Sequence, residues 1–452
     1  MLTSAGPVRS PDQLFRTCRA LTVVDYVSLI LRVLAFAIFL FAALVGFLYA
    51  TRGTAVRRVR GVEAAGEPVP PSDPHFPLGI ALLTGTLLTP GNEVELAIDG
   101  DGTFPRLWED LRSAERFILV QTYYGKPGRV ADMLRDLLVQ RARAGVRVFV
   151  LYDAFGFRTA SREDVESLRR AGVQVFPFRP LRFSTLYVLQ NRSHVRLVVV
   201  DGRVGWTGGF GVDDKWLGDG RTEGAWRETN VRFEGPAVLQ LSAAFAAAWS
   251  EATGDLFSAR PVPEPREGGV AQAGVLYASP TLGSTAAERF LALSIASARR
   301  TLYVTNAYFA PAENFVDLLV VEALSGVDVR LLVGGPRTDV AITRLAARAR
   351  YERLLEAGVR IYEWQPSTLH AKTFVVDGVW SAVGTMNFDN RSLALNEEVM
   401  LLVLDEAFGA RMNSLFFDDI RFAKEIELDE FRRRSWVERI AEKAASRVTR
   451  IL

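Results

Sequence analysis

The strongest constraint on the fold is an internal repeat, because the second half of the chain runs through the same succession of motifs as the first. FILVQTYY (117–124) is matched by LYVTNAYFAP (302–311), and AGVRVFVLYDAFG (144–156) by SGVDVRLLVGG (325–335). The copies are too far apart in sequence for the short repeats of a solenoid, so each is better read as a half-domain. We therefore expect two related lobes packed against each other about a pseudo-two-fold axis.

Within each copy, apolar runs rich in β-branched and aromatic residues alternate with helical stretches such as 130–145. This alternation is typical of α/β proteins, so each lobe is predicted to be a mixed sheet flanked by helices. Two punctuated segments, 61–77 and 260–274, divide the chain. The predicted order is a polar segment (1–25), a transmembrane helix (26–51), a linker (52–88), a first lobe (89–262), a second lobe (263–412) and a helical tail (413–452).

The predicted transmembrane helix rests on an apolar run. From Tyr26 to Ala50 only Ser28, Arg32 and Gly46 interrupt it, and no charge follows Arg32. A run of this length spans a bilayer, and an arginine near its start can extend toward the headgroups. A cleaved signal peptide is the alternative, although the polar lead is long and no clear small-x-small site follows. Arginines are slightly more numerous after the run (52, 57, 58, 60) than before it (9, 16, 19). Because the flank richer in Lys and Arg usually stays in the cytoplasm, we expect the bulk of the chain there.

Charge and cysteine content argue against several classes of protein. The 54 Lys and Arg residues against 52 Asp and Glu leave a formal net charge of +2. The chain therefore lacks the overall basic field that drives nonspecific binding to nucleic acid. Its only cysteine, Cys18, lies outside the predicted lobes, so neither a disulfide framework nor a cysteine-based metal site is available.

Two of the three histidines occupy matching places in the two copies. His194 opens HVRLVVVDGRVGWTGGFGVDD and His370 opens HAKTFVVDGVWSAVGTMNFDN, and the two segments align without gaps. The third, His75, lies in the proline-rich connector and is predicted to be an ordinary solvated residue. Each segment reads as a strand, an Asp-Gly turn that supplies positive φ, and a second strand.

On a strand, residues i and i+2 share a face, so His194 is predicted to lie beside Arg196 and His370 beside Lys372. A cation can hold phosphoryl oxygens while a neutral imidazole attacks phosphorus or moves a proton. Two such copies facing each other supply a nucleophile and an acid at one site, without a metal or another cofactor. The alternative is that each histidine is a packed structural residue, which the duplication makes less attractive.

At these residues the sequence resembles the phospholipase D superfamily, whose signature is His-x-Lys-x4-Asp followed by Gly-Gly or Gly-Ser, present twice. Within it, residues 89–452 are most similar to bacterial cardiolipin synthases, and VGTMNFDNRSLALNEEV follows that family's pattern. The resemblance implies a phosphohistidine intermediate, in which one histidine attacks the phosphodiester and the other serves as acid and then base. It places the nucleophile on His194.

The resemblance also implies roles for the surrounding residues. Lys372 and Asn387 are expected to bind phosphoryl oxygens, Glu398 to orient His370, Glu228 to orient His194, and Asp377 to brace its loop. The predicted catalytic set is His194, Arg196, Asp201, His370, Lys372 and Asp377, and the predicted phosphate-binding and orienting set is Asn387, Glu398, Glu228, Gly208, Gly209 and Ser392. The first copy departs from the pattern at Arg196, where the family has Lys, and at Gly211, which stands where the second copy has Asn387.

The function predicted from the resemblance is a membrane-associated phosphatidyltransferase that makes cardiolipin and glycerol from phosphatidylglycerol. Its partners would be a phospholipid substrate and the membrane, whereas nucleic acid is disfavoured. The protein would cross the bacterial inner membrane once. The alternatives are a hydrolase that releases phosphatidic acid, a nucleic-acid phosphodiesterase, and a non-catalytic lipid-binding paralogue. The near-neutral charge argues against the second, and the intact second motif against the third.

Two amphipathic stretches each have two interpretations. Residues 179–192 place apolar side chains among arginines before the first motif, and they either rest on a bilayer or form a buried connection. In the tail, an apolar helical stripe either touches anionic lipid or packs on the catalytic core; it comprises Val437, Ile440, Ala441, Ala444, Val448 and Ile451.

Overall fold

The computed structural model describes residues 23–50, 55–61, 66–182, 188–256, 269–281 and 283–448. It consists of two compact units, Met1–Arg52 and Gly53–Leu452. The described part of the first unit is helix α1 (Val23–Ala50). Within it, Asp25–Leu44 is long and apolar enough to cross a membrane, a test that an N-terminal signal sequence also passes. Side chains such as Phe36 and Phe39 are exposed in this helix.

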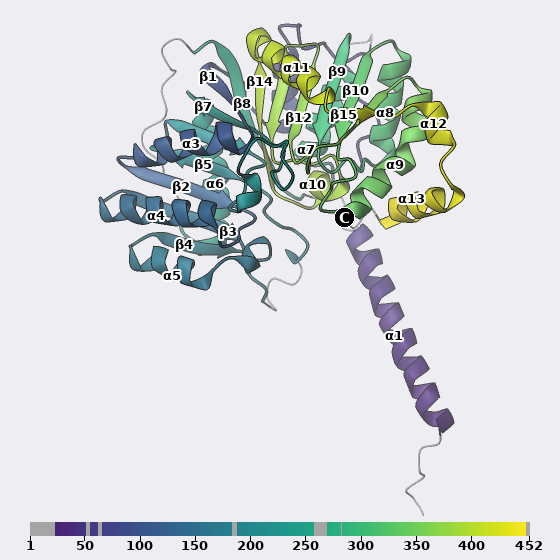
Figure 1. Ribbon diagram of the computed structural model, residues 1–452, viewed down its shortest axis with the longest axis horizontal. Helices are drawn as coiled ribbons and strands as arrows, with labels where there is room; N and C mark the ends of the chain where they lie inside the picture. Colours follow the sequence, from purple (N-terminus) through teal and green to yellow (C-terminus); the bar gives the residue numbers. More distant parts are fainter. Residues whose placement is uncertain are drawn as a thin grey trace, which may run out of the picture. The chain divides into compact units, whose positions relative to one another are not determined.

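The second unit is built on a 15-stranded sheet whose two halves repeat one topology (Figure 1). From the central pair β1–β8 outward, one half runs β1-β7-β6-β5-β2-β3-β4 and the other β8-β14-β13-β12-β9-β10-β11, with β15 added at the edge. The predicted duplication about a pseudo-two-fold axis is therefore confirmed. The strands are β1 (Thr89–Ile98), β2 (Phe117–Thr122), β3 (Arg147–Asp153), β4 (Gln174–Phe178), β5 (Leu197–Val200), β6 (Val204–Gly208), β7 (Thr229–Glu234), β8 (Ala271–Ala278), β9 (Thr301–Asn306), β10 (Asp328–Val333), β11 (Arg360–Trp364), β12 (Lys372–Val376), β13 (Trp380–Gly384), β14 (Glu398–Leu404) and β15 (Ala423–Glu425).

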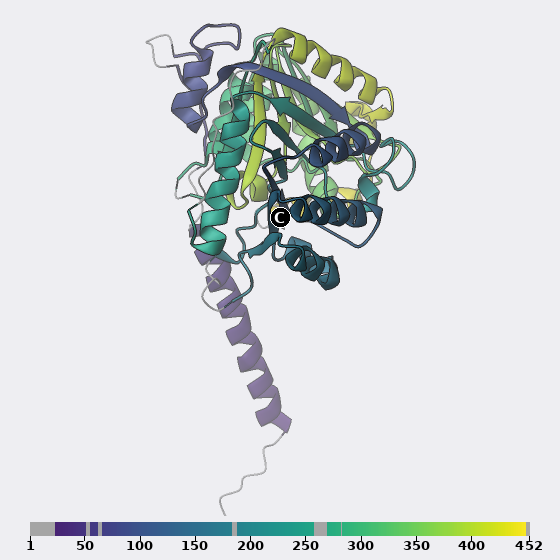
Figure 2. The ribbon, with the colours of Figure 1, turned by 90° about the vertical axis from the view of Figure 1, so that its left-hand side faces the viewer.

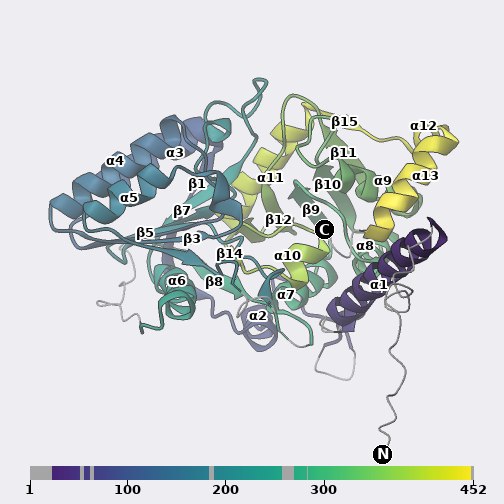
Figure 3. The ribbon, with the colours of Figure 1, turned by 90° about the horizontal axis from the view of Figure 1, so that it is seen from below.

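Helices cover the sheet in both halves. Helices α3 (Asp99–Arg112), α4 (Arg129–Arg143) and α5 (Arg162–Arg170) cover the first half, and α7 (Ala286–Ala296), α8 (Glu313–Leu324) and α9 (Ala341–Glu356) cover the second. Helices α6 (Ala237–Thr253) and α11 (Glu406–Ile420) share a central core with strands of both halves. Figure 2 shows α6 on the opposite face of the first half from α4 and α5, and Figure 3 shows the same arrangement from below.

The central core joins the halves into one body. Phe233 of β7 and Val399 of β14 are buried in the same cluster, together with Phe245 of α6 and Phe416 of α11. Burial of a large aromatic or aliphatic side chain contributes about 1.5–3 kcal/mol, so this shared cluster strongly favours a fixed packing of the halves. The fixed packing matters because the histidine motifs lie where the halves meet.

Two predicted segments contain elements that were not expected in them. The linker 52–88 contains helix α2 (Phe76–Thr84), in which Phe76 and Ile80 are fully buried and Phe76 packs edge-on against Trp380. The boundary at 413 falls inside α11, and the predicted helical tail contains β15, which pairs antiparallel with β11. Both segments belong to the core because they bury side chains or complete a sheet edge. His75 is exposed, with its ring beside Asp73.

The tail also contains helices α12 (Leu428–Arg432) and α13 (Trp436–Val448). Ala445 of α13 packs against Ala346 of α9, and the buried Glu442 is paired with Arg348 at 2.9 Å. The interpretation that the tail packs on the core is therefore confirmed for Ala445 and Glu442. Of the predicted stripe, Ile451 lies outside the described residues. Trp436, Val437 and Ile440 stay more than half exposed.

Candidate active site

The two histidines lie on extended segments that lead into β5 and β12. In each case the backbone is held by the opposite half of the protein. The N–H of His194 donates to the carbonyl of Glu397 at 2.9 Å, and the N–H of His370 donates to the carbonyl of Arg227 at 2.8 Å. Both histidines are therefore fixed at the junction of the halves. His370 lies two residues before β12 and His194 three residues before β5, the strands on which they were predicted.

A hairpin loop follows each of these strands. The register pairs Val200 with Val204 and Val376 with Trp380, so each loop contains three residues and begins with Asp-Gly. Asp201 and Asp377 have φ of 56° and 53°, and the positive φ predicted for these turns is therefore observed. Asparagine and aspartate tolerate this left-handed region better than most residues with a side chain.

Each imidazole is oriented by a buried carboxylate from the opposite half. Nδ1 of His370 is 2.6 Å from Oε2 of Glu228, and Nδ1 of His194 is 3.0 Å from both carboxylate oxygens of Glu398. The predicted pairing, Glu398 with His370 and Glu228 with His194, is thus wrong. Within its own half, Glu398 is two strands away from His370, whereas the packing of the halves brings it directly against His194.

The carboxylates are themselves fixed by donors. Thr385 Oγ1 donates to Glu398 Oε2 at 2.5 Å, and the N–H of Thr229 donates to Glu228 Oε1 at 3.0 Å. A carboxylate that accepts from Nδ1 leaves Nε2 of that ring as the nitrogen with the free lone pair. This arrangement is what a nucleophilic or proton-accepting imidazole requires.

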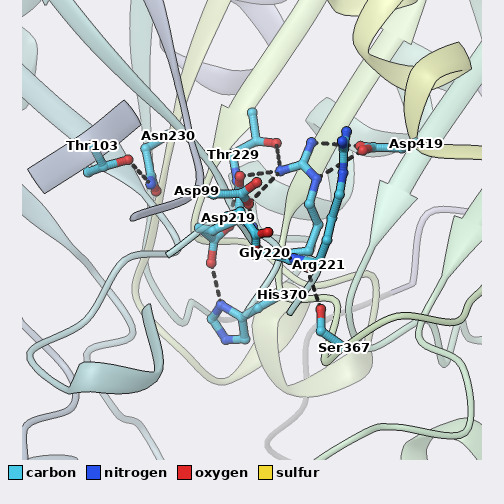
Figure 4. Close-up of polar contacts among 12 residues, drawn as sticks. Asp99, Thr103, Asp219, Gly220, Arg221, Thr229, Asn230, Ser367, His370 and Asp419 are labelled. Carbon is cyan, nitrogen blue, oxygen red and sulfur yellow. Dashed lines mark hydrogen bonds and ion pairs between the residues drawn. The ribbon is translucent and has the colours of Figure 1, made fainter. Parts of the chain in front are cut away.

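The residue whose carbonyl accepts from the His370 backbone is a buried arginine, Arg227. Arg227 pairs with Asp419 of α11 at 2.6 Å and with Asp99 at 3.2 Å, and so joins the two halves. Figure 4 shows His370 beneath this network, with Asp99, Thr229 and Asp419 above the ring. Breaking a buried ion pair by removing one partner costs about 3–5 kcal/mol. The two carboxylates therefore fix Arg227, and with it the carbonyl that accepts from the His370 N–H. Arg227 was not singled out in the sequence.

Both imidazoles line one cavity of about 680 Å³. Arg196, Asn387 and Ser392 line it as well, and each has a buried polar atom that finds no hydrogen-bond partner among the described residues: Nε and Nη1 of Arg196, Oδ1 of Asn387 and Oγ of Ser392. Buried polar groups are normally paired, so such atoms together indicate a place where a polar ligand can bind. Phosphoryl oxygens would accept from Arg196 and Ser392, and the amide of an asparagine can also donate.

Burial favours the neutral form of both imidazoles. Burial lowers the pKa of His194 to about 4, although the charge of Glu398 opposes this. Burial, and then the positive charges of Lys372 and Arg196, hold the pKa of His370 well below its ordinary value. A phosphodiester anion in the cavity would raise both values, because it stabilises the imidazolium form.

Glu228, the carboxylate that bonds His370, can be protonated near neutral pH. Burial raises the pKa of Glu228 to about 7, against the opposing charge of Lys372. The Glu228–His370 pair can therefore hold a proton at neutral pH and pass it to a departing oxygen. Lys372 is fully buried, and its Nζ donates to the carbonyl of His370.

Comparisons with known proteins show the family of this chain. The profile of the family described as "Cardiolipin synthase, PLD-like domain" matches residues 107–249 and 291–420. The cardiolipin synthase of Geobacillus kaustophilus is 35% identical over 368 residues, which covers 80% of this chain and 72% of that protein. This chain belongs to the cardiolipin synthase family of phospholipase D-like proteins. Cardiolipin synthase A of Pseudomonas fluorescens is likewise 35% identical, over 80% of this chain and 75% of its own.

Solved structures show the same fold at low identity. The phosphatidylserine synthase of Haemophilus influenzae matches with a TM-score of 0.61 at 15% identity, covering 81% of this chain and 97% of its own. The polyphosphate kinase of Porphyromonas gingivalis matches with a TM-score of 0.51 at 13% identity, covering 79% of this chain and 50% of its own. The resemblance to the family and the α/β fold of two related halves, predicted from the sequence, are confirmed.

Seven of the twelve predicted site residues do not line the cavity. Three of them, Lys372, Glu228 and Glu398, bond the histidines instead, and the other four have structural roles. Asp201 accepts the backbone N–H groups of residues 115–117, and Asp377 accepts those of 299–301, so each braces a hairpin. Gly209 makes room for a carboxylate, since a Cβ there would fall 2.2 Å from Glu228 Oε2. Gly208, with φ of 148°, packs against Asn230. None of the four lines the cavity.

The departure at Gly211 has a structural reason. A Cβ at this position would fall 2.6 Å from the indole ring of Trp216. The indole therefore fills the space that a side chain at Gly211 would need, and its Nε1 donates to Glu228 Oε2 at 3.4 Å. The two copies differ in consequence: Asn387 lines the cavity in the second copy, whereas Trp216 occupies the corresponding space in the first.

No group of three or more His, Cys, Asp or Glu side chains in the described part of the chain is arranged to hold a metal ion.

Trp216 and its neighbour Lys215, which also line the cavity, were not predicted as site residues. Aromatic residues near a motif are also common in protein cores, so the sequence pattern does not single these two residues out.

Proposed function

We propose that this protein is a cardiolipin synthase that transfers a phosphatidyl group from one phosphatidylglycerol to another. The observation that carries the proposal is the pair of imidazoles in one cavity, each backed by a carboxylate and accompanied by buried, unpartnered phosphate-binding groups. This arrangement supplies what the two steps of a phosphodiester exchange need: a nucleophile, a proton donor and a fixed positive charge.

In the first step, Nε2 of His194 attacks phosphorus, and the bond from phosphorus to the glycerol oxygen breaks as His370 donates a proton to that oxygen. In the second step, His370 removes the proton from the terminal hydroxyl of another phosphatidylglycerol. The oxygen of that hydroxyl attacks phosphorus and displaces His194, which yields cardiolipin and restores both histidines. Arg196, Asn387 and Ser392 hold the phosphoryl oxygens throughout.

Apolar residues at the cavity support a lipid as the substrate. Phe155, Leu181 and Leu189 line it and are exposed on their outer sides. Acyl chains can contact such a rim, whereas a nucleic acid would be served by a basic groove. Of the stretch predicted to rest on a bilayer, Phe183, Leu186 and Tyr187 lie outside the described residues.

We further propose that the protein crosses the bacterial inner membrane once and has its catalytic unit in the cytoplasm. Helix α1 supports it by length and composition. Helix α13 adds an exposed apolar face of Trp436, Val437 and Ile440, beside cations at Arg439 and Lys443. This combination is typical of helices that lie on anionic bilayers.

The test uses the full chain with labelled phosphatidylglycerol in mixed micelles. Accumulation of cardiolipin and glycerol supports the proposal, whereas release of phosphatidic acid alone would make the protein a hydrolase, and no lipid change would contradict catalysis. An ester with an activated leaving group needs no acid catalyst. With such an ester, His370→Ala is expected to accumulate phosphohistidine and His194→Ala is not; the reverse result would exchange the roles.

A further inference from the structure

A further cation lines the cavity near His370 and has no role in the two steps described above. Lys215 belongs to the short 3-10 helix η4 (Asp214–Trp216) and lines the cavity. Its Nζ lies over three aromatic rings, 3.6 Å from the ring centroid of Trp226, 4.2 Å from that of Tyr124 and 4.5 Å from that of Trp216. Among the described residues, this ammonium group makes no hydrogen bond or ion pair through its side chain. It is therefore available to an anion that enters the cavity.

The rings that hold Lys215 also contact His370. The ring of Trp226 is 5.0 Å from the imidazole and that of Trp216 is 5.5 Å away, centroid to centroid. The ammonium group and the acid–base imidazole therefore contact the same two indole rings. In phosphatidylglycerol, five bonds separate the terminal hydroxyl oxygen from phosphorus, a reach of about 6 Å when extended. A lipid whose hydroxyl meets His370 can therefore place its own phosphate at Lys215.

Among the described residues, the cation at the matching position of the second copy already has a hydrogen-bond partner. Arg391 occupies the position in the second copy that aligns with Lys215, and it lines the same cavity. Its Nη1 donates to the carbonyl of Gln190 at 3.1 Å. The residue aligned with Trp216 is Ser392, which cannot form an aromatic support. The two ends are therefore built for different parts of the reaction.

We infer that Lys215, held on Trp226, Tyr124 and Trp216, binds the phosphodiester of the acceptor lipid whose terminal hydroxyl is activated by His370. The inference rests on the proposed function and adds to it a site that distinguishes an acceptor with a phosphate from glycerol or water. Aromatic rings remove part of the water around the ammonium group, which strengthens its attraction for a phosphate anion. In the second step the acceptor is thereby held with its hydroxyl oxygen directed at the phosphohistidine.

The experiment compares two acceptors that react with the same intermediate. The full chain is incubated with phosphatidylglycerol and radiolabelled glycerol, and cardiolipin formation is measured alongside incorporation of label into phosphatidylglycerol. Free glycerol has no phosphate, so the ratio of the two products reports the acceptor site. Lys215→Met, which keeps the apolar stem on the rings, is expected to lower the ratio of cardiolipin to exchange at least about tenfold, the effect of losing ~1.4 kcal/mol of binding.

Lys215→Arg is expected to restore most of this ratio because it keeps the charge. The matched control is Lys126→Met, which removes an exposed cation 5.8 Å from the same Tyr124 ring but outside the cavity. Its ratio is expected to equal that of the wild type. Thermal unfolding of each variant, with Lys215→Gln as a second neutral substitution, separates a loss of acceptor binding from a loss of fold.

Three results would overturn the inference. An equal loss of both products in Lys215→Met would assign the residue to a step common to both acceptors. A selective loss of cardiolipin in Arg391→Met, with Lys215→Met at the wild-type ratio, would place the acceptor at the other end. A wild-type protein that forms neither product would remove the proposed function, and the acceptor site with it.

Discussion

The crossed arrangement of carboxylates makes a prediction that can be followed one histidine at a time. Glu398→Gln keeps the size of the side chain but removes the charge that faces His194. Glu398 is 1% exposed, so water does not screen the loss. A hydrogen bond to a charged group contributes about 1.5–3 kcal/mol, which corresponds to a decrease of about 10- to 150-fold in kcat/KM.

The tautomer adds to this loss. A glutamine can turn its NH2 group toward Nδ1 of His194, which moves the ring proton to Nε2 and removes the lone pair that attacks phosphorus. With both effects we expect kcat/KM to fall about 10³-fold or more. Glu228→Gln is the matched variant for His370, because Glu228 is buried to the same extent and bonds Nδ1 at 2.6 Å.

Nitrogen-15 NMR of histidine-labelled protein distinguishes the two variants. The chain has only three histidines, and His194→Ala and His370→Ala each remove one set of ring signals and so assign the spectrum. In Glu398→Gln the ring nitrogens of His194 are expected to change tautomer while those of His370 stay as they are, and Glu228→Gln is expected to give the converse. A Glu398→Gln spectrum in which His370 changes and His194 does not would refute the crossed pairing.

Further substitutions test other contacts. Gly211→Ala is expected to destabilise the protein by about 1–3 kcal/mol, because its Cβ would meet the Trp216 ring; chemical unfolding measures this, and Trp216→Ala in the same chain should relieve it. Asp377→Ala is expected to lower the free energy of unfolding by about 2–4 kcal/mol through three lost amide contacts, and Asp377→Asn, which tolerates the left-handed φ, by less. Burial lowers the pKa of Lys215 to about 8, although Asp213 and Asp339 oppose this and Lys126 and Arg196 add to it. Below that pH the ammonium form binds an anion, so KM for the acceptor lipid should rise as the pH increases through about 8, and this rise should be absent in Lys215→Arg, which stays charged.

The features that could be predicted from the sequence are those set by local pattern and duplication. The gap-free alignment of His194 with His370 located both hairpins, and Asp201 and Asp377 have the positive φ that their Asp-Gly turns require. The α/β class followed from alternating runs within each copy. These features depend on residues close together in the chain, which a pattern can reveal.

The pairing of carboxylate with imidazole could not be predicted in the same way. Glu398 lies near His370 in sequence but bonds His194, because the packing of the halves decides which imidazole it meets. The burial of Phe76 in a segment that reads as a linker depends likewise on Trp380, far along the chain. Lys215 gave no signal because the three rings that hold it come from separate segments.

The reciprocal bonds between the halves have a consequence for how such a protein can arise and be divided. A chain carrying one half alone would present a histidine with no carboxylate behind its ring, and a carboxylate with no histidine to orient. Such a fragment would gain both only by pairing with another molecule. An ancestor of half this length would therefore have worked as a dimer, and fusion of its two copies would have freed each to diverge, as Gly211 and Trp216 have done at one end.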